Sequence, residues 1–441
     1  MCMFRFRFTM AWLRKLRRER GQGSCSGYED ILVATTIARI GTEEEENKPN
    51  PRRGSIVGRR TIARDRYSGY CRLVEDYFVS NSVYGENLFR RRFRMTKNMF
   101  EDIKDACEQA NVYFKWRQNA AGVWGLAPVQ KVTAALRMLA YGGPADSLDE
   151  YLRMGESTII ESVNQFTRTI VDLYGPRYLR QPTRDEIEIL LQVAEARGFP
   201  GMLGSIDCMH WEWENCPTAW HGQYRGYFKK PTLILEAVAS YDTWIWHAFF
   251  GLPGSLNDIN VLHRSPVFDN LAAGNAPEVQ FNVNGREYNM GYYLADGIYP
   301  PWATLINGIQ QPRTNKHKEF SSRQAEFRKD VERTFGILQG QYGIIKGPAR
   351  LWDQVDLKYI VDCIVILHNM GIEYEKGLPQ LRATDYEGAT DPRLGDDNTN
   401  VPELALLMEN HRRIQSRQGN EQLKLDLIEH IWSKYGDRAN N

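Results

Sequence analysis

The sequence has few cysteines, no long apolar run and no excess of charge of either sign. Its seven cysteines are scattered over 441 residues and are odd in number, so they do not form a disulfide framework and indicate a reducing compartment. No stretch of about 18 or more apolar residues occurs, which excludes a membrane-spanning helix. The 56 basic and 55 acidic residues give a formal net charge of +1. Because a local basic surface is enough to bind DNA, this balance leaves nucleic-acid binding open.

Positive charge is nevertheless concentrated at the beginning of the chain, where seven Lys and Arg residues fall within the first 20. The tract Arg14–Arg18 is typical of a nuclear-import or phosphate-contacting segment. A solvated basic tail or a mitochondrial presequence has the same composition. Four consecutive glutamates at 43–46 and two nearby prolines follow, so we predict a disordered, charged tail over residues 1–65.

A second break in the pattern spans residues 376–402, where Gly, Asp, Asn and Pro cluster, and it predicts a disordered linker. Beyond it, Leu423, Leu427 and Ile431 recur at helical spacing. We therefore expect a helical tail over residues 403–441 that packs on the body of the protein or on a partner.

Between these breaks, residues 66–198 have helical periodicity, with helix-ending and helix-capping residues in the order expected for a helix-turn-helix. One helix is expected to end at Tyr141, before Gly142-Gly143-Pro144, and a short second helix is expected over Ser147–Met154. Ser157 is then placed to cap a third helix. This order suits contact with DNA, but it equally suits any small helical bundle.

Residues 199–375 change to short apolar runs separated by turns, which indicates a domain with a sheet. The expected order is three strands, helix, strand, helix, strand and helix. In chain order these are strands at Met202–Trp213, Thr232–Tyr241 and Trp244–Gly251, a helix from Asp258, a strand at Gly291–Asp296, a short helix from Trp302, a strand at Ile309–Gln311 and a long helix at Ser321–Gln339. We therefore predict an α/β fold, a ribonuclease-H-like mixed sheet flanked by helices and preceded by the helical domain.

Three acidic residues stand out within this domain. Asp207 lies in the middle of an apolar strand, where a carboxylate is costly to bury unless it is paired or binds a metal. Asp296 ends another apolar strand, and Glu332 lies at the margin of the apolar face of the long helix. Converging carboxylates suit phosphodiester chemistry, because two hard cations bound to them stabilise both the attacking and the leaving oxygen. An ordinary turn at Asp296 and an ordinary ion pair between Glu332 and Arg328 are the alternatives.

Asp258 is a fourth candidate, because it follows the third strand in a Pro-Gly-Ser-Leu-Asn-Asp segment. It would either cap a helix or add a metal ligand beside the other three acids. A zinc site is a weaker alternative, because its four candidate ligands lack paired-knuckle spacing. Those ligands are Cys208, His210, Cys216 and His221.

Several segments, taken in order, resemble the PIF/Harbinger transposase superfamily, and most closely its plant-transposon type. They are Gly204-Ser-Ile-Asp207-Cys208-Met-His210-Trp, Pro253-Gly254-Ser255-Leu-Asn-Asp258, Leu294-Ala-Asp296-Gly297-Ile-Tyr299-Pro300, Val331-Glu332-Arg333-Thr-Phe335-Gly336-Ile and Leu367-His368-Asn369-Met370. The resemblance covers about residues 70 to 375. Asp207, Asp296 and Glu332 match the catalytic acids of its DDE site, with 35 residues between the last two, and Asp258 matches a recurring acidic position.

The resemblance implies a DDE-type nuclease that uses two Mg²⁺ or Mn²⁺ ions, bound by Asp207, Asp258, Asp296 and Glu332, for transposon excision and integration. It also implies a nuclear protein that acts on DNA as an oligomer, with a Myb/SANT-like DNA-binding partner and no membrane. A domesticated transposase that binds DNA or protein without catalysis has the same residues. By charge, some basic residues near the site are expected to contact phosphate. These are Lys229, Lys230, Arg313, Lys316, Lys318 and Arg333.

Overall fold

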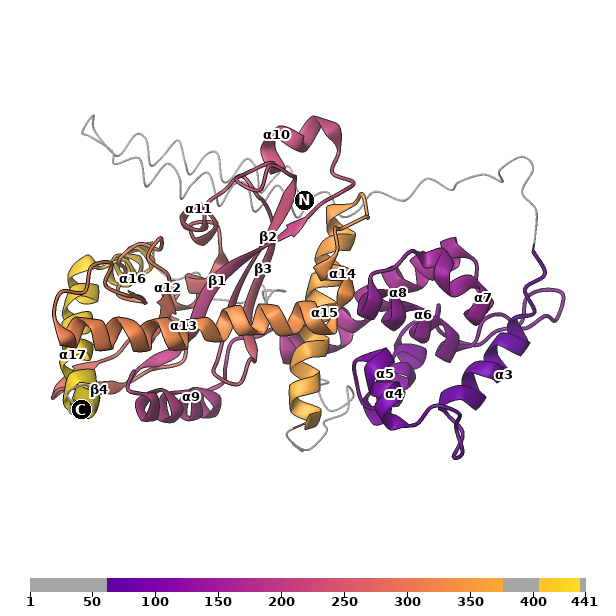
Figure 1. Cartoon of the computed structure of the whole chain (residues 1–441), viewed down its shortest axis with the longest axis horizontal. Helices are drawn as coiled ribbons and strands as arrows, with labels where there is room; N and C mark the ends of the chain where they lie inside the picture. Colours follow the sequence, from indigo (N-terminus) through magenta and orange to yellow (C-terminus); the bar gives the residue numbers. More distant parts are fainter. Residues whose placement is uncertain (1–61, 376–403, 437–441) are drawn as a thin grey trace. The chain divides into compact units, whose positions relative to one another are not determined.

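A computed structural model describes residues 62–375 and 404–436 of the chain (Figure 1). The basic tract Arg14–Arg18, nearly all of the predicted N-terminal tail and the predicted linker lie outside these residues. None of the described helices combines the length and the apolar character that a membrane crossing requires. The five described cysteines are free thiols.

The region that precedes the sheet consists of helices around an aromatic core. Its elements are α3 (Arg66–Tyr77), α4 (Glu86–Phe93), α5 (Lys97–Ala110), α6 (Pro128–Tyr141), η1 (Ala145–Leu148), α7 (Asp149–Leu152), α8 (Glu156–Tyr178) and α9 (Arg184–Arg197). Tyr77, Phe89, Phe93 and Phe100 are almost completely buried, and the rings of Phe89 and Phe93 stack with centroids 4.3 Å apart. Aromatic pairs in this geometry add to the stability that burial of their area provides.

The predicted turn between α6 and α8 is present, with one correction. Gly142 ends α6 in the left-handed conformation, at φ 63°, which glycine adopts without steric cost. The short helix of the prediction is the pair η1 and α7. The predicted cap at Ser157 is wrong, because Gly155 is the N-cap and Ser157 lies inside the first turn of α8.

A five-stranded mixed sheet with the order β3-β2-β1-β6-β7 forms the second region (Figure 1). Its strands are β1 (Met202–Glu212), β2 (Thr232–Ala239), β3 (Ile245–Pro253), β6 (Tyr292–Ala295) and β7 (Leu305–Asn307). β1, β2 and β3 pair antiparallel, whereas β1 pairs parallel with β6, and β6 pairs parallel with β7. β1 is the central strand and joins the antiparallel half to the parallel half, whose strands are apolar because helices cover both faces of the sheet.

Helices on the two faces of the sheet bury different clusters. The remaining elements are η2 (Thr218–Trp220), α10 (His221–Tyr224), α11 (Asp258–Leu262), η3 (Pro266–Phe268), α12 (Asp269–Ala272), β4 (Phe281–Val283), β5 (Arg286–Tyr288), α13 (Asn315–Gln341), α14 (Gly343–Lys346), α15 (Gln354–Glu375), α16 (Leu404–Ile414) and α17 (Arg417–Tyr435). The long helix α13 crosses the strands on one face, with α17 at one of its ends (Figure 1). α11, η3 and α12 pack on the other face around Ile206 and Val238. The predicted α/β, ribonuclease-H-like class is thus confirmed.

Two local predictions in this domain are wrong. No helix begins at Trp302, where the chain instead turns into β7, and Ile309–Gln311 is not a strand. Within its described residues, the predicted C-terminal helical tail consists of two helices, because Ser416 caps the second of them by accepting a bond from the Gly419 N–H. Asn420 of α17 donates to the Trp302 and Leu305 carbonyls, so this helix is fixed to the turn that replaces the expected helix.

Candidate functional site

Two neighbouring parallel strands bring Asp207 and Asp296 to adjacent positions in the sheet. Ser205 of β1 is paired with Leu294 of β6; Asp207 lies two residues further along β1, and Asp296 is the first residue after β6. Because side chains alternate with a period of two, Asp207 lies on the same face as Ser205. Ser205 accepts from a backbone N–H of α13, and Leu294 packs in the cluster that includes Phe320 and Phe327 of α13. Asp207 therefore lies on the face that α13 covers, whereas Asp296 lies in the turn that follows β6.

Glu332 is placed beside them by the position of α13 on this face. The Val331 N–H donates to the Ser205 hydroxyl over 3.1 Å, so the helix residue next to Glu332 contacts the strand residue two before Asp207. Gln324, further up the helix, donates to the carbonyls of Ala295 and Ile306. These buried bonds fix α13 against β1, β6 and β7. The helix therefore presents Glu332 to the site.

Arg328 lies between two of the carboxylates. Its Nη1 atom is 2.7 Å from Glu332 Oε1 and 3.7 Å from Asp207 Oδ2. The Asp207 and Arg328 side chains are each 19% exposed, whereas the Glu332 side chain is 41% exposed. Glu332 is thus partly open to solvent but joined to Asp207 through a shared guanidinium.

Burial perturbs the electrostatics of the site. It raises the pKa of Asp207 to about 6, although the Cys208 N–H and the Arg328 charge act in the opposite direction. The charges of Asp258 and Glu332 add to the rise in this pKa. A carboxylate held among like charges in a half-buried site is a frequent property of functional sites.

Asp258 is held near the other acids, although it lies at the start of α11. Burial raises the pKa of Asp258, a hydrogen bond with the Cys208 side chain lowers it, and the charges of Asp296 and Glu236 raise it again. The helix cap is Asn257, whose side chain accepts from the Asn260 N–H, so Asp258 is not needed for capping. Pairwise interactions therefore link Asp207 to Glu332, Asp207 to Asp258, and Asp258 to Asp296.

Asp296 itself is fixed by backbone hydrogen bonds at the end of β6. Its Oδ1 atom accepts from the Ile298 N–H over 2.6 Å, and its carbonyl accepts from Asn307 of β7 over 3.1 Å. Asn307 also donates to the Tyr299 carbonyl. These bonds close the Asp296-Gly297 turn and hold the carboxylate at the strand end.

A further buried acid, Glu236, was not selected from the sequence. It lies opposite Cys208 on β2, is completely buried and contacts His247 at 3.2 Å, and Ser265 donates to it. Its second carboxylate oxygen lacks a hydrogen-bond partner among the described residues. The signal was present, because Glu236 is a charged residue inside an apolar strand, as Asp207 is.

The carboxylates are of the type that binds divalent metal ions, but their side chains do not converge on one ion position in this structure. Hard oxygen donors with mutual repulsion are what Mg²⁺ and Mn²⁺ prefer. Among residues 62–375 and 404–436, however, no three His, Cys, Asp or Glu side chains converge closely enough to hold an ion. Binding of a metal by Asp207 and Glu332 would require Arg328 to move from between them.

The four residues of the zinc alternative have other contacts. Cys208 lies 3.5 Å from the Tyr299 hydroxyl, and His210 contacts the Thr232 hydroxyl at 3.0 Å. His221 contacts the carbonyl of Cys216 at 2.9 Å. These contacts give no support to a zinc site.

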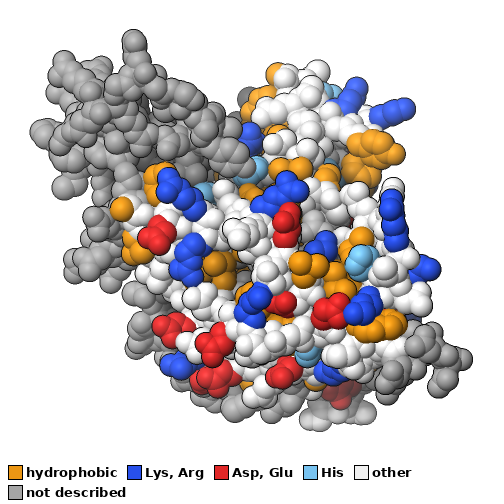
Figure 2. Space-filling view, turned by 90° about the vertical axis from the view of Figure 1, so that its left-hand side faces the viewer, with side chains coloured by type: hydrophobic (Ala, Val, Ile, Leu, Met, Phe, Trp, Pro, Cys, Tyr) orange, Lys and Arg blue, Asp and Glu red, His pale blue; other side chains and the backbone are white. Residues whose placement is uncertain are grey.

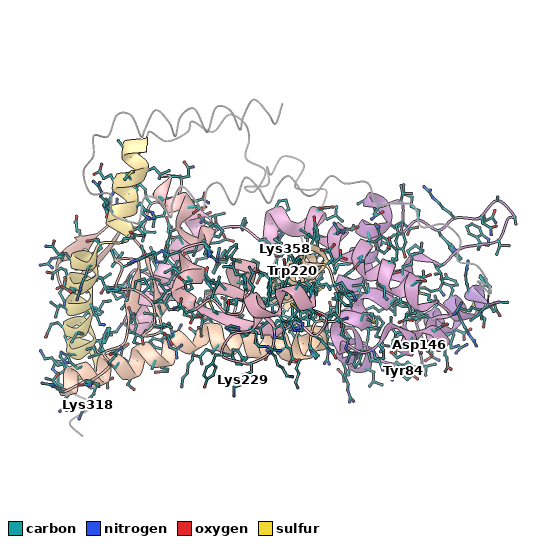
Figure 3. All side chains as sticks on the ribbon, turned by 90° about the horizontal axis from the view of Figure 1, so that it is seen from above. Tyr84, Asp146, Trp220, Lys229, Lys318 and Lys358 are labelled. Carbon is teal, nitrogen blue, oxygen red and sulfur yellow. The ribbon has the colours of Figure 1, made fainter. Side chains whose placement is uncertain are left out.

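The basic residues near the site divide into paired and exposed groups. Lys230 pairs with Glu212, Lys316 with Glu429, and Arg333 with Asp330. Lys229, Arg313 and Lys318 have exposed side chains, and Lys229 and Lys318 lie at the periphery of the molecule in Figure 3. On the face drawn in Figure 2, basic and acidic side chains are interspersed. Phosphate contact by these residues stays a prediction.

Comparisons with known proteins agree with the resemblance seen in the sequence. A family described as plant transposon protein matches residues 176–378, and a domain of unknown function matches residues 69–108. A protein of Arabidopsis thaliana described as ALP1-like is 25% identical over 261 residues, which cover 56% of this chain and 61% of that relative. No solved structure matches the chain. With the ordered motifs around Asp207, Asp258, Asp296 and Glu332, these matches support a relation between this chain and transposase-derived proteins of the PIF/Harbinger type.

Proposed function

We propose that this protein is a metal-dependent DNA endonuclease of the transposase type. It would hydrolyse phosphodiester bonds at transposon ends and then join the freed 3′ hydroxyl to target DNA. The observation that carries the proposal is the position of Asp207 on β1 under α13, where Arg328 contacts both Asp207 and Glu332, with Asp296 just beyond the end of the adjacent parallel strand β6. Carboxylates so placed are expensive to bury unless a cation compensates them.

In this proposal Asp207, Asp258, Asp296 and Glu332 hold one or two Mg²⁺ or Mn²⁺ ions. Such ions, when bound, stabilise the attacking and leaving oxygens and lower the pKa of bound water. Because burial raises the pKa of Asp207 to about 6 without a metal, a cation would compete with a proton for this carboxylate at and below about pH 6. Arg328, once displaced from Glu332, has the planar donor geometry that pairs with a phosphate oxygen.

The test is a nicking assay on supercoiled plasmid and on hairpin DNA with the full chain, in MgCl₂, in MnCl₂ and in EDTA. We expect metal-dependent nicking by the wild type and background nicking by Asp296→Asn. Asp105→Asn is the matched control, because that aspartate is on α5 and its side chain is 57% exposed. Equal nicking by the wild type and Asp296→Asn would assign the activity to a contaminant or another centre.

The second candidate is a domesticated factor that binds DNA or protein without cutting. The position of Arg328 favours it, since a guanidinium that permanently bridges Asp207 and Glu332 would occupy the metal position. This candidate predicts no metal-dependent nicking and no thermal stabilisation by Mn²⁺, together with retained binding of DNA or a partner.

On the family relation, we further propose that the protein acts in the nucleus, as an oligomer on DNA, with a Myb/SANT-like DNA-binding partner. The Arg14–Arg18 tract supports nuclear import by its charge alone. Deleting the tract from a fluorescent fusion should move the protein out of the nucleus. An unchanged distribution would reject this tract as the import signal.

A further inference from the structure

The connection between β1 and β2 carries two aromatic residues at the tip of a tight turn. The Lys229 N–H donates to the Gly226 carbonyl, and Arg225 forms a bridge with Pro231, so Tyr227 and Phe228 are the central residues of a closed turn. Such positions usually hold Gly, Pro, Asn or Asp, which have a conformational reason to be there. Tyr227 is 94% exposed and Phe228 is 55% exposed. Two large rings presented to water at a turn indicate an interaction site rather than a packing requirement.

Two contacts anchor this aromatic turn to segments that carry two of the acids. The Phe228 ring packs on His210, with centroids 4.8 Å apart, and His210 is three residues after Asp207 on β1. Three residues of strand span about 10 Å, and this odd offset directs the His210 and Asp207 side chains to opposite faces of the sheet. The backbone of Gly226 also packs directly on Gly254, with no space for a Cβ atom, and Asp258 follows four residues later. The turn is therefore anchored to the strand of one acid and to the loop of another.

The chemistry around the two rings is basic. Arg225, Lys229 and Lys230 flank them in the sequence with exposed side chains, and Lys230 pairs with Glu212. Lys229 adopts a left-handed backbone conformation, at φ 57°, which a lysine rarely takes, so the turn keeps its shape at a cost in strain. Figure 2 shows hydrophobic and basic side chains side by side at the top of the molecule, where Figure 1 places the neighbouring α10.

We propose that Tyr227 and Phe228 form a stacking platform for unpaired DNA bases next to the cleavage position. The inference rests on the proposed nuclease function and adds a base-binding surface to it. Exposed aromatic rings with flanking cations are the combination that binds single-stranded DNA without sequence preference, because every base has a stacking face. A protein partner would not need this combination of base-sized rings and phosphate-binding cations.

The test measures binding of the full chain to fluorescent 20-nucleotide single-stranded DNA and to the matching blunt duplex, by anisotropy in EDTA. We expect the double variant Tyr227→Ala/Phe228→Ala to lose about tenfold or more in affinity for the single strand. Its affinity for the duplex should change less than about twofold. Tyr227→Phe keeps the ring and should bind as the wild type does. Tyr67→Ala is the matched control, because Tyr67 is 60% exposed but lies on α3.

Unchanged single-strand affinity of the double variant would overturn the inference, as would an equal loss for both DNAs or an equal loss in Tyr67→Ala. If the double variant binds DNA normally but its self-association falls in sedimentation, the turn docks protein and the inference is also overturned. Since EDTA prevents metal-dependent cutting, this outcome is separate from the nicking assay. Aromatic-dependent binding without any nicking would refute the nuclease and leave the platform standing.

Discussion

Replacing Asp207 with asparagine should stabilise the protein at neutral pH while removing the proposed activity. Burial raises the pKa of Asp207 from its usual 3.8 to about 6, so ionising it in the folded protein costs free energy. A rise of about 2.2 units corresponds to roughly 3 kcal/mol at 1.36 kcal/mol per unit. Asparagine is nearly isosteric and its side-chain oxygen still accepts from the Cys208 N–H, so the substitution removes the charge with little change in packing. The destabilising charge can thus be removed without disturbing the packing around residue 207.

The direction of the pKa shift determines the pH range in which the substitution stabilises the protein. A carboxylate whose pKa is higher in the folded state destabilises it above about pH 6, and this cost disappears as the pH falls towards 4. The free energy of unfolding in urea should be up to about 3 kcal/mol higher for Asp207→Asn than for the wild type at pH 7.5. The two values should converge near pH 4. Asp105→Asn serves as the exposed control and should show no such window. A less stable Asp207→Asn at pH 7.5, or a difference that does not change with pH, would refute the reasoning.

Three further changes test other parts of the structure. Arg328→Gln removes the cation between Asp207 and Glu332, so Mn²⁺ should raise the melting temperature more than in the wild type; a lost response would contradict this. Gly204→Ala should destabilise by roughly 1–3 kcal/mol in urea, because φ is 156° and a Cβ atom would lie 2.5 Å from the Ala239 carbonyl oxygen; an unchanged midpoint would reject the clash. Leu427→Ala should cost about 2–5 kcal/mol, because this α17 residue is completely buried; a melting curve like that of the wild type would show that α17 does not stabilise the body.

The sequence predicted the elements that have long apolar runs and the site residue whose charge is unfavourable to bury. β1 and α13 were found because apolar runs of their length have few alternatives, and Asp207 because a charge inside such a run needs an explanation. The adjacency of Asp207 and Asp296 followed from the predicted fold rather than from any local signal. Glu236 had the same local signal as Asp207, and weighing all charged residues within apolar strands would have selected it.

Short elements and tertiary contacts could not be predicted from the local periodicity of the sequence. β7 has three residues, too few for a period to show, and the chain before it turns because Asn420 of α17 binds its carbonyls. Arg328 looked like an ordinary helix partner of Glu332, four residues away. Its contact with Asp207 depends on how α13 lies across β1, which no local spacing encodes.

The charge balance of the site helps to distinguish the proposed nuclease from the alternative of a non-catalytic binding protein. When ionised, Asp207, Asp258, Asp296 and Glu332 carry four negative charges, and Arg328 supplies one positive charge among them. The raised pKa of Asp207 shows that this single charge does not compensate for burial and for the neighbouring acids. Two divalent ions would bring four positive charges and invert the repulsion that now raises that pKa. A pure binding protein would gain by losing one of these acids, whereas a nuclease needs them all, so the uncompensated charge favours the catalytic proposal.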